Sequence, residues 1–240
     1  MSIQINYKSG TSKPKKVNIV LFTDEKFKIS NLKKYITNSE FSFISDLIKS
    51  KNLKHKIITF DINSRKKILL VSLKKNITNY EIEDLGAKFY IYIKDFVQRD
   101  FNINSDTLSN QLKNHLGYFL HGLKLKSYKF EKYLTKKNKK IISIAISGKN
   151  KPSTKDQIKF KSIEEGTFYT RDLVSEPGNV LHPDEYAKRL NSLKKDGLKI
   201  NIYDEKKLKK LGMNTLLGVG QGSIRGSYLV TIEWSGMKNN

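Results

Sequence analysis

Two short, largely apolar runs constrain the fold of this chain more than any other feature. Ile68 to Leu73 and Ile141 to Ile146 are rich in Ile, Leu and Val, as expected of strands buried within a sheet. Between them, Thr78 and Glu81 form a capping-box pair that opens a helical apolar pattern. Buried strands that alternate with amphipathic helices predict an α/β domain with a largely parallel sheet.

The other elements of this first domain complete a predicted three-layer α/β arrangement with a mixed, largely parallel sheet. We expect the run from Ile68 to Leu73 to lie at the centre of that sheet. The domain should end near residue 150, because Lys149 to Thr154 is polar, contains a proline and precedes a helical pattern. Further strands are predicted at residues 3–7, 17–22, 55–62 and 101–103, the first two flanking a polar loop at Pro14, and helices at 41–48, 78–97 and 108–123.

A helix end, a rigid loop and a helix start follow in the later part of the chain. A periodic apolar row stops at Glu176, because the following Pro177 disfavours the helical conformation there. Pro183 suits the first position of a new helix. Asp184 and Glu185 come next, in the first turn, where the helix dipole favours carboxylates.

These signals divide the chain into three predicted parts. Residues 1–150 form the amino-terminal α/β domain, 151–182 a linker helix and loop, and 183–240 a second α/β region. In this last part we expect a helix over residues 183–195, a strand at 198–202, a short helix ending at Gly212 and a strand at 229–233.

Composition excludes several classes of protein. The chain has no cysteine, so it has neither a disulfide framework nor a cysteine-ligated metal. No apolar run approaches the length of a membrane span, and residues 1–10 lack the apolar core of a signal peptide. We therefore expect a cytoplasmic protein without a membrane partner.

The formal charge of +23 is compatible with nucleic-acid binding. Of the 46 basic residues, however, 41 are Lys and 5 are Arg, and Ile and Asn are also abundant. Lys, Ile and Asn have AT-rich codons, whereas base-reading surfaces prefer Arg. Codon bias is therefore the favoured explanation of the high lysine content. On this explanation we expect the lysines to be scattered over the surface, the run Lys136 to Lys140 to be a solvated turn, and DNA binding to be weak and sensitive to salt. A non-enzymatic basic module that binds nucleic acid remains the alternative.

No motif in the chain assembles a catalytic or nucleotide site. Gly218, Gly220 and Gly222 lack the remaining positions of a dinucleotide fingerprint or a phosphate-binding loop, which favours a structural glycine loop. The four histidines have no partner at the i, i+4 spacing of a helical zinc site, and His182 is better explained as a helix-entry residue. They are His55, His115, His121 and His182.

A carboxylate cluster could be drawn from Asp172, Glu176, Asp184 and Glu185. A local ion pair between Arg171 and Asp172 and a capping role for the acids of the later helix explain these residues without any catalysis. We therefore predict no catalytic, cofactor-binding or metal-ligating residue in this chain.

Two long motifs resemble the leucine (cytosol) aminopeptidase family. Thr170 to Pro183 follows the family pattern Arg-Asp-Leu, Asn-x-Pro-x-Asn, x-x-x-Pro, with Ser175 in place of the first asparagine. Leu211 to Ser223 follows the pattern Leu-Gly-Met, two small residues, Leu-Leu-Gly-Val-Gly-Gln-Gly-Ser, with Asn214 and Thr215 as the pair. The resemblance is good from Ile163 to Gly236 and weak before residue 150.

The resemblance implies an aminopeptidase that removes amino-terminal residues, often Leu, from peptides. Family members use two divalent metal ions, Mn or Zn, for hydrolysis, assemble as hexamers, and in some cases bind DNA. Their metal ligands lie in Gly-Lys-Gly-x-x-x-Asp-x-Gly-Gly and Asn-Thr-Asp-Ala-Glu-Gly-Arg motifs, which follow the strand matching Leu229 to Glu233 and are absent here. We therefore expect a fragment that binds no metal, holds only the beginning of the catalytic domain and is inactive alone.

Overall fold

The chain divides into two compact units, Met1–Tyr169 and Thr170–Asn240. The predicted loop at Pro14 and the central part of the predicted turn at Lys136 to Lys140 lie outside the residues that the structure describes. The computed structural model describes residues 3–7, 17–50, 55–109, 112–136 and 140–236.

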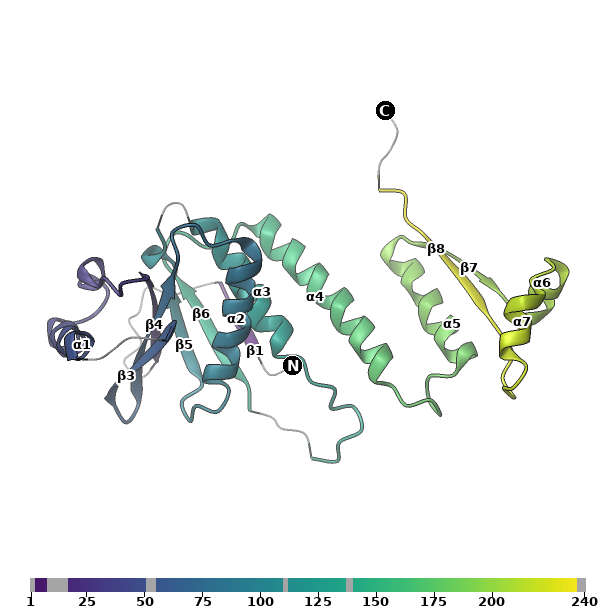
Figure 1. Cartoon of the computed structure of the whole chain (residues 1–240), viewed down its shortest axis with the longest axis horizontal. Coiled ribbons are helices and arrows are strands. Elements are labelled where there is room, and N and C mark those ends of the chain that lie inside the picture. Colours follow the sequence, from purple (N-terminus) through teal and green to yellow (C-terminus); the bar gives the residue numbers. More distant parts are fainter. Residues whose placement is uncertain (1–2, 8–16, 51–54, 110–111, 137–139, 237–240) are drawn as a thin grey trace. The chain divides into compact units, whose positions relative to one another are not determined.

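The first unit is built on a mixed sheet of six strands in the order β1-β6-β5-β2-β4-β3 (Figure 1). All neighbouring strands are parallel except β3 and β4, which form an antiparallel hairpin. The largely parallel α/β sheet is thus confirmed. The strands are β1 (Ile3–Asn6), β2 (Asn18–Asp24), β3 (Ile57–Asn63), β4 (Lys66–Leu73), β5 (Asp100–Asn104) and β6 (Ile142–Ser147).

Strand β4 is buried on both faces, and its side chains alternate between two cores. Ile68 and Leu70 pack into one core with Ile44 of α1 (Asn38–Ser50), while Leu69 and Val71 face the other. The expected central position of β4 is wrong, because its hairpin partner β3 is an edge strand, which puts β4 next to the edge.

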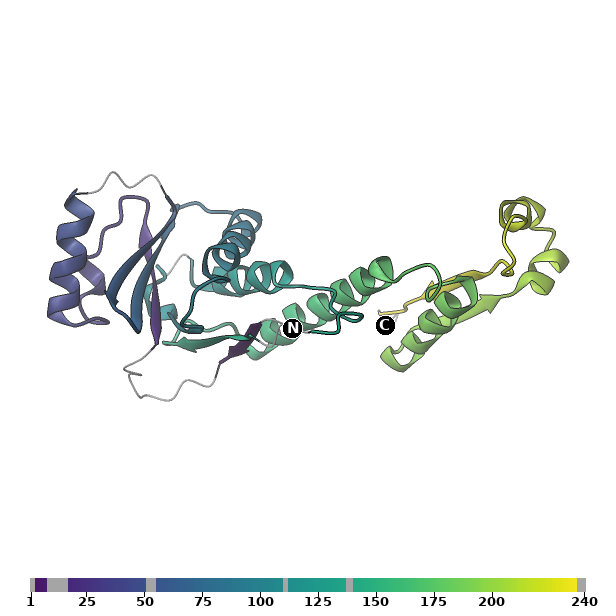
Figure 2. The same ribbon diagram turned by 90° about the horizontal axis from the view of Figure 1, so that it is seen from below.

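Helices cover both faces of the sheet, which confirms the three layers. Figure 2 shows α1 on one side of the sheet and α2 (Asn79–Ile93) with α3 (Leu116–Lys126) on the other. Helix α2 begins with the predicted capping box: Glu81 N–H donates to Thr78 Oγ1 over 3.2 Å, and Thr78 N–H donates to Glu81 Oε2 over 3.0 Å. This helix ends at Ile93, before the expected residue 97.

The single helix expected over residues 108–123 is wrong in its first half. Short 3-10 turns cover Ser105–Thr107 and Lys113–His115, and α3 starts only at Leu116. Leu108 and Leu112 are nevertheless buried, so the apolar stripe is real although its backbone is not α-helical. Side-chain hydrogen bonds hold this segment to the strands: Ser105 Oγ donates to Ser147 O over 2.8 Å, and Thr107 Oγ1 accepts from Phe22 N over 2.9 Å.

Helices α2 and α3 approach so closely that their backbones touch. A Cβ atom added to Gly86 of α2 would lie 1.9 Å from Phe119 O of α3, and one added to Gly122 of α3 would lie 1.9 Å from Glu83 O of α2. Each helix therefore presents a glycine to a carbonyl of the other. The short spacing lets Phe89 and Phe119 pack in the shared core, with ring centroids 5.4 Å apart.

Helix α4 (Thr154–Ser175) starts within the first unit, which extends beyond the predicted boundary at residue 150 to Tyr169. The extension has a physical reason in two buried aromatic side chains. Phe160 packs against His121 of α3, and Phe168 stacks on Tyr128, with ring centroids 5.0 and 5.4 Å apart. The first part of the helix is therefore a component of the α/β layer.

The second unit contains a two-stranded antiparallel sheet of β7 and β8, together with α5, α6 and α7. The predicted helix over residues 183–195 is α5 followed by a 3-10 turn, which ends at the left-handed Gly197. Both predicted strands are present. The elements are α5 (Pro183–Asn191), β7 (Lys199–Tyr203), α6 (Glu205–Lys210), α7 (Asn214–Gly220) and β8 (Leu229–Glu233).

The glycine run is not a simple loop, which corrects the expectation from its sequence. Gly218 and Gly220 lie in α7, whose first turn includes the hydrogen bond from Leu217 N–H to Met213 O. Gly222 follows the helix and lies in a turn. Close approach is required at Gly220, where an added Cβ would lie 2.0 Å from Ser227 Oγ. Within the described ranges, no helix has the length and apolarity to cross a membrane.

Candidate functional site

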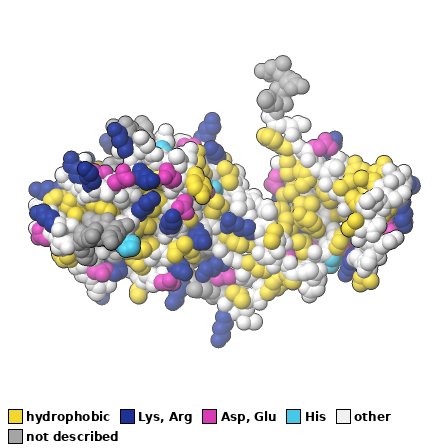
Figure 3. All heavy atoms as spheres, in the orientation of Figure 1, with side chains coloured by type: hydrophobic (Ala, Val, Ile, Leu, Met, Phe, Trp, Pro, Cys, Tyr) yellow, Lys and Arg dark blue, Asp and Glu magenta, His cyan; other side chains and the backbone are white. Residues whose placement is uncertain are grey.

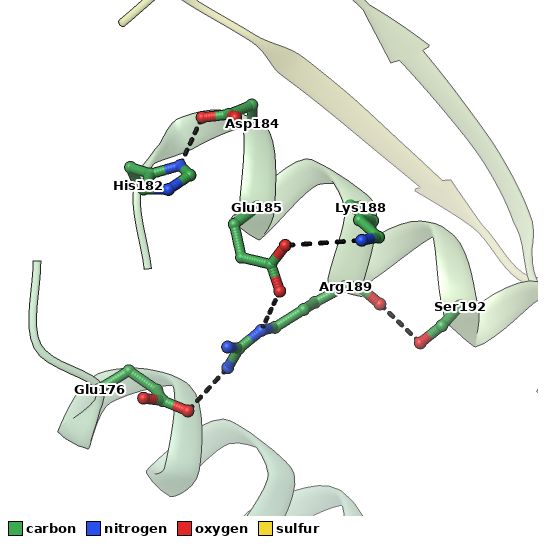
Figure 4. A network of polar contacts seen from close by, with 7 residues as sticks. All are labelled: Glu176, His182, Asp184, Glu185, Lys188, Arg189 and Ser192. Atoms are coloured by element: carbon green, nitrogen blue, oxygen red, sulfur yellow. Dashed lines mark hydrogen bonds and ion pairs between the residues drawn. The ribbon is translucent and has the colours of Figure 1, made fainter. Parts of the chain in front are cut away.

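The junction between α4 and α5 is the part of the second unit with the densest polar contacts (Figure 4). As predicted, α4 stops just before Pro177, and α5 has Pro183 at its first position with His182 as the N-cap. The intervening loop is closed by Val180 and Leu181, whose N–H groups both donate to Pro177 O over 2.9 Å. Proline geometry at both ends therefore fixes the path of the chain.

Arg189 of α5 bridges two carboxylates across this junction. Its Nη1 donates to Glu176 Oε1 and its Nε to Glu185 Oε1, each over 2.9 Å. The hydrogen bond from Arg189 holds the pKa of Glu185 below its ordinary value, and the two carboxylates raise the pKa of Arg189. The Glu176 side chain is only 1% exposed, so the guanidinium neutralises a carboxylate that water scarcely reaches.

A second pair lies at the N-terminus of α5. His182 Nδ1 and Asp184 Oδ1 are 2.5 Å apart, and Arg225 Nη1 lies 3.5 Å from Asp184 Oδ2. Desolvation opposes ionisation of Asp184, but the hydrogen bond from His182, its own backbone N–H and the nearby charges lower its pKa below the ordinary value. The residue acts as a helix-end anion, as expected.

This geometry supports a structural role for the network. Glu176, Asp184 and Glu185 are each paired with a basic side chain, so they do not form the open carboxylate cluster that the sequence could suggest. Throughout the described residues, no three His, Cys, Asp or Glu side chains converge as a metal site would require. The residues present therefore do not fit a two-metal centre.

The four histidines have different local surroundings. His55 is exposed, whereas His115 is the N-cap of α3 and its buried Nδ1 has no hydrogen-bond partner within the described residues. His121 is buried, with Nδ1 3.2 Å from Glu164 Oε1, and His182 lies at the start of α5. The sequence pattern indicated the role of His182. It did not indicate the contact between His121 of α3 and Glu164 of α4, because the two residues are 43 positions apart in sequence.

Replacing Arg189 by Met should lower the free energy of unfolding of the second unit, because the scarcely exposed carboxylate of Glu176 would lose its ion pair with Arg189. Urea unfolding combined with hydrogen exchange of the α5 amides measures this effect. Lys188→Met is the matched control on the same helix, since Lys188 is 82% exposed and lies 3.9 Å from Glu185. It should change the free energy of unfolding by less than about 0.5 kcal/mol; equal effects of the two variants would contradict the structural role of Arg189.

Comparison with known families first identifies the class of proteins that this chain resembles. Residues 168–240 match the model of the cytosol aminopeptidase family's catalytic domain. The matched stretch contains the whole network of Figure 4, from Glu176 to Ser192. The matched family is one of peptide-hydrolysing enzymes, and the curated relatives have aminopeptidase names. Within that class, the resemblance to the cytosol aminopeptidase family that the two motifs predicted is confirmed.

Curated relatives agree with this family. Probable cytosol aminopeptidases of Phytoplasma mali and Brucella anthropi are 39% and 40% identical to this chain over 141 and 127 residues. The alignments cover 56% and 49% of this chain, but only 28% and 25% of the relatives. The chain thus spans about a quarter of the length of the curated relatives that it matches.

Solved structures share the fold. A mutant of tomato leucine aminopeptidase superimposes with a TM-score of 0.74 and 19% identity, covering 100% of this chain and 52% of that one. The bottromycin maturation enzyme BotP, in complex with Mn, gives a TM-score of 0.67 and 15% identity, covering 92% of this chain and 45% of that one. These likenesses confirm the predicted α/β fold class.

Proposed function

We propose that this chain is part of a metal-dependent leucyl aminopeptidase, which removes amino-terminal residues from peptides by two-metal hydrolysis in the cytoplasm. The observation that carries the proposal is the match of residues 168–240 to the family's catalytic domain. The names of the relatives, which are probable cytosol aminopeptidases, support the same reaction class and location. Assembly into a hexamer belongs to the proposal as well.

Two divalent ions, Mn or Zn, would supply the activation of water and the polarisation of the scissile carbonyl. The described residues of this chain do not offer the converging oxygen donors that such hard cations require. In the proposed enzyme the ligands therefore come from other sequence. This chain contributes the first α/β unit and the proline-bounded junction held by Arg189. The 240 residues alone are proposed to be inactive.

Purified 240-residue chain should therefore release no p-nitroaniline from Leu-p-nitroanilide above a metal-only blank, with either Mn²⁺ or Zn²⁺ added. A fusion of this chain to the remaining region of the Phytoplasma mali relative, which should restore the metal-binding motifs, is expected to turn over the substrate and to lose activity with a chelator. The physical reason is that two-metal hydrolysis requires ligands that hold both ions about 3.5–4 Å apart.

The 240-residue chain and the fusion test two different parts of this proposal, the inactivity of the chain alone and the aminopeptidase function. Chelator-sensitive turnover by the 240-residue chain would contradict its proposed inactivity. A folded fusion that remains inactive with every metal would contradict the aminopeptidase function itself. Urea unfolding of both samples is the control, since it shows that an inactive sample is folded.

The distribution of charge favours this proposal over a nucleic-acid-binding module. On the face of the first unit seen in Figure 3, Lys and Arg side chains lie among acidic and apolar ones and do not gather into a single patch. A face with mixed charges like this one offers phosphate groups only weak contacts. We therefore propose no separate nucleic-acid function.

A further inference from the structure

A partly open cavity of about 350 Å³ lies in the first unit between β1, α3 and the first part of α4. Its volume is at the small end of the range for ligand pockets, which suits a molecule the size of one amino acid better than a nucleotide. Most of its lining is apolar. The apolar lining includes Leu120, Ile158 and Phe168, and the polar lining includes Tyr7, Lys124 and Glu164.

Lys124 is a largely buried cation whose ammonium contacts a backbone carbonyl. Its Nζ donates to Ile3 O over 2.9 Å, and within the described residues no carboxylate forms an ion pair with it. Burial lowers the pKa of Lys124, and the charge of Glu164 opposes that shift only in part. Because an ammonium has three protons to donate and a buried charge is costly without a partner, this group is suited to an anionic ligand.

Tyr7 adds a second donor to the same cavity. Within the described residues its hydroxyl makes no hydrogen bond, and burial together with the charge of Glu164 raises its pKa to about 12. The hydroxyl therefore stays protonated at neutral pH. A neutral O–H and an ammonium that line the same cavity are suitable donors for one carboxylate.

Glu164 provides the opposite charge. One carboxylate oxygen lies 3.2 Å from His121 Nδ1, while the other makes no hydrogen bond within the described part of the chain. Its side chain is 13% exposed, so its remaining acceptor capacity is only partly satisfied by water. The cavity thus combines a cation, an anion and an apolar wall.

We propose that this cavity binds a small α-amino acid with an apolar side chain, such as leucine or phenylalanine. The ligand carboxylate contacts Lys124 and Tyr7, its ammonium contacts Glu164, and its side chain packs on Leu120, Ile158 and Phe168. This site lies wholly in the first unit and does not rest on the aminopeptidase function.

Isothermal titration of L-leucine and L-phenylalanine into the 240-residue chain tests the site directly. Saturable binding is expected, and Lys124→Met should weaken it by about tenfold or more, because a charge-assisted contact is lost while the apolar stem is kept. Tyr7→Phe, which removes only the hydroxyl, should weaken it by about threefold or more. The matched control is Lys126→Met on the exposed side of α3, which should leave the affinity within about twofold of the unmodified chain.

Two ligand analogues identify the chemistry that is recognised. 4-Methylpentanoate lacks the ammonium and leucinamide lacks the carboxylate, and both should bind about tenfold more weakly than leucine. Glu164→Gln should weaken leucine binding without changing that of 4-methylpentanoate. Equal affinity for leucine and 4-methylpentanoate would overturn the amino-acid assignment. Absence of saturable leucine binding to the folded chain, or unchanged binding by folded Lys124→Met, would overturn the site.

Discussion

Gly86→Ala should destabilise the first unit by about 3 kcal/mol or more, and Gly122→Ala should have a similar effect. The new methyl carbon would lie 1.9 Å from a backbone carbonyl oxygen in either case, Phe119 O or Glu83 O. Alanine is favoured over glycine in a helix by about 1 kcal/mol. The steric term is expected to win, because a backbone atom of a packed helix cannot turn aside as the end of a side chain can.

Urea unfolding measures both variants, with the slope of the transition showing whether the two-state comparison is valid. Gly166→Ala in α4 is the matched control, since an added Cβ there meets nothing within 4 Å. That variant should raise the free energy of unfolding by about 0.5–1 kcal/mol through helix propensity alone. Stabilisation by all three substitutions would show that the close contact of α2 and α3 does not exist.

Lys66→Met should lower the free energy of unfolding by about 3 kcal/mol, because it leaves Glu40 as a charged side chain in a site with little solvent exposure. Lys66 Nζ lies 2.5 Å from Glu40 Oε1, and the two side chains are 17% and 9% exposed. Glu40 also caps α1, since Glu40 Oε2 accepts from Thr37 N over 2.9 Å. Thermal or urea unfolding gives the change. Lys88→Met removes an exposed pair with Asp84 and should leave the free energy of unfolding nearly unchanged.

The loss of stability in Lys66→Met should depend on pH, because Glu40 titrates in acid. Desolvation would raise the pKa of Glu40, but the hydrogen bonds from Lys66 and Thr37 and the charge of Lys66 lower it below its ordinary value of 4.5. The stabilisation is therefore complete above pH 4.5 and is lost as the pH falls through the lower folded-state pKa. Without Lys66, burial should raise the pKa of Glu40, so the stability difference between Lys66→Met and the unmodified chain should shrink in acid. A constant difference between pH 7 and pH 3 would contradict this account.

Local signals predicted the elements that local chemistry determines. The capping box of Thr78 and Glu81 and the prolines at 177 and 183 mark helix ends through contacts within a few residues, and the structure has those ends. The late start of α3 was not predicted, because the chain before it is held by hydrogen bonds of Ser105 and Thr107 to distant strands. An apolar stripe alone does not contain that information.

Sequence patterns did not predict contacts between side chains that lie far apart in the sequence. The pairing of Arg189 with Glu185 fits an i, i+4 spacing, but its contact with Glu176 depends on the path of the loop between two helices. The cavity around Lys124 likewise includes Tyr7, which follows β1, and Glu164 of α4. Only the assembled fold brings such residues together.

The position of β1 has a consequence for how the first unit forms during synthesis. Its residue Ile3 pairs with Ile142 of β6, so the sheet's first strand in sequence order hydrogen-bonds to its last. At typical rates of about 5–20 residues per second, the two segments leave the ribosome on the order of ten seconds apart. Helices and the hairpin between them can form within that interval, but β1 has no partner strand until β6 appears. Closure of this edge is therefore a late, non-local step that limits how early the nascent chain can complete its core.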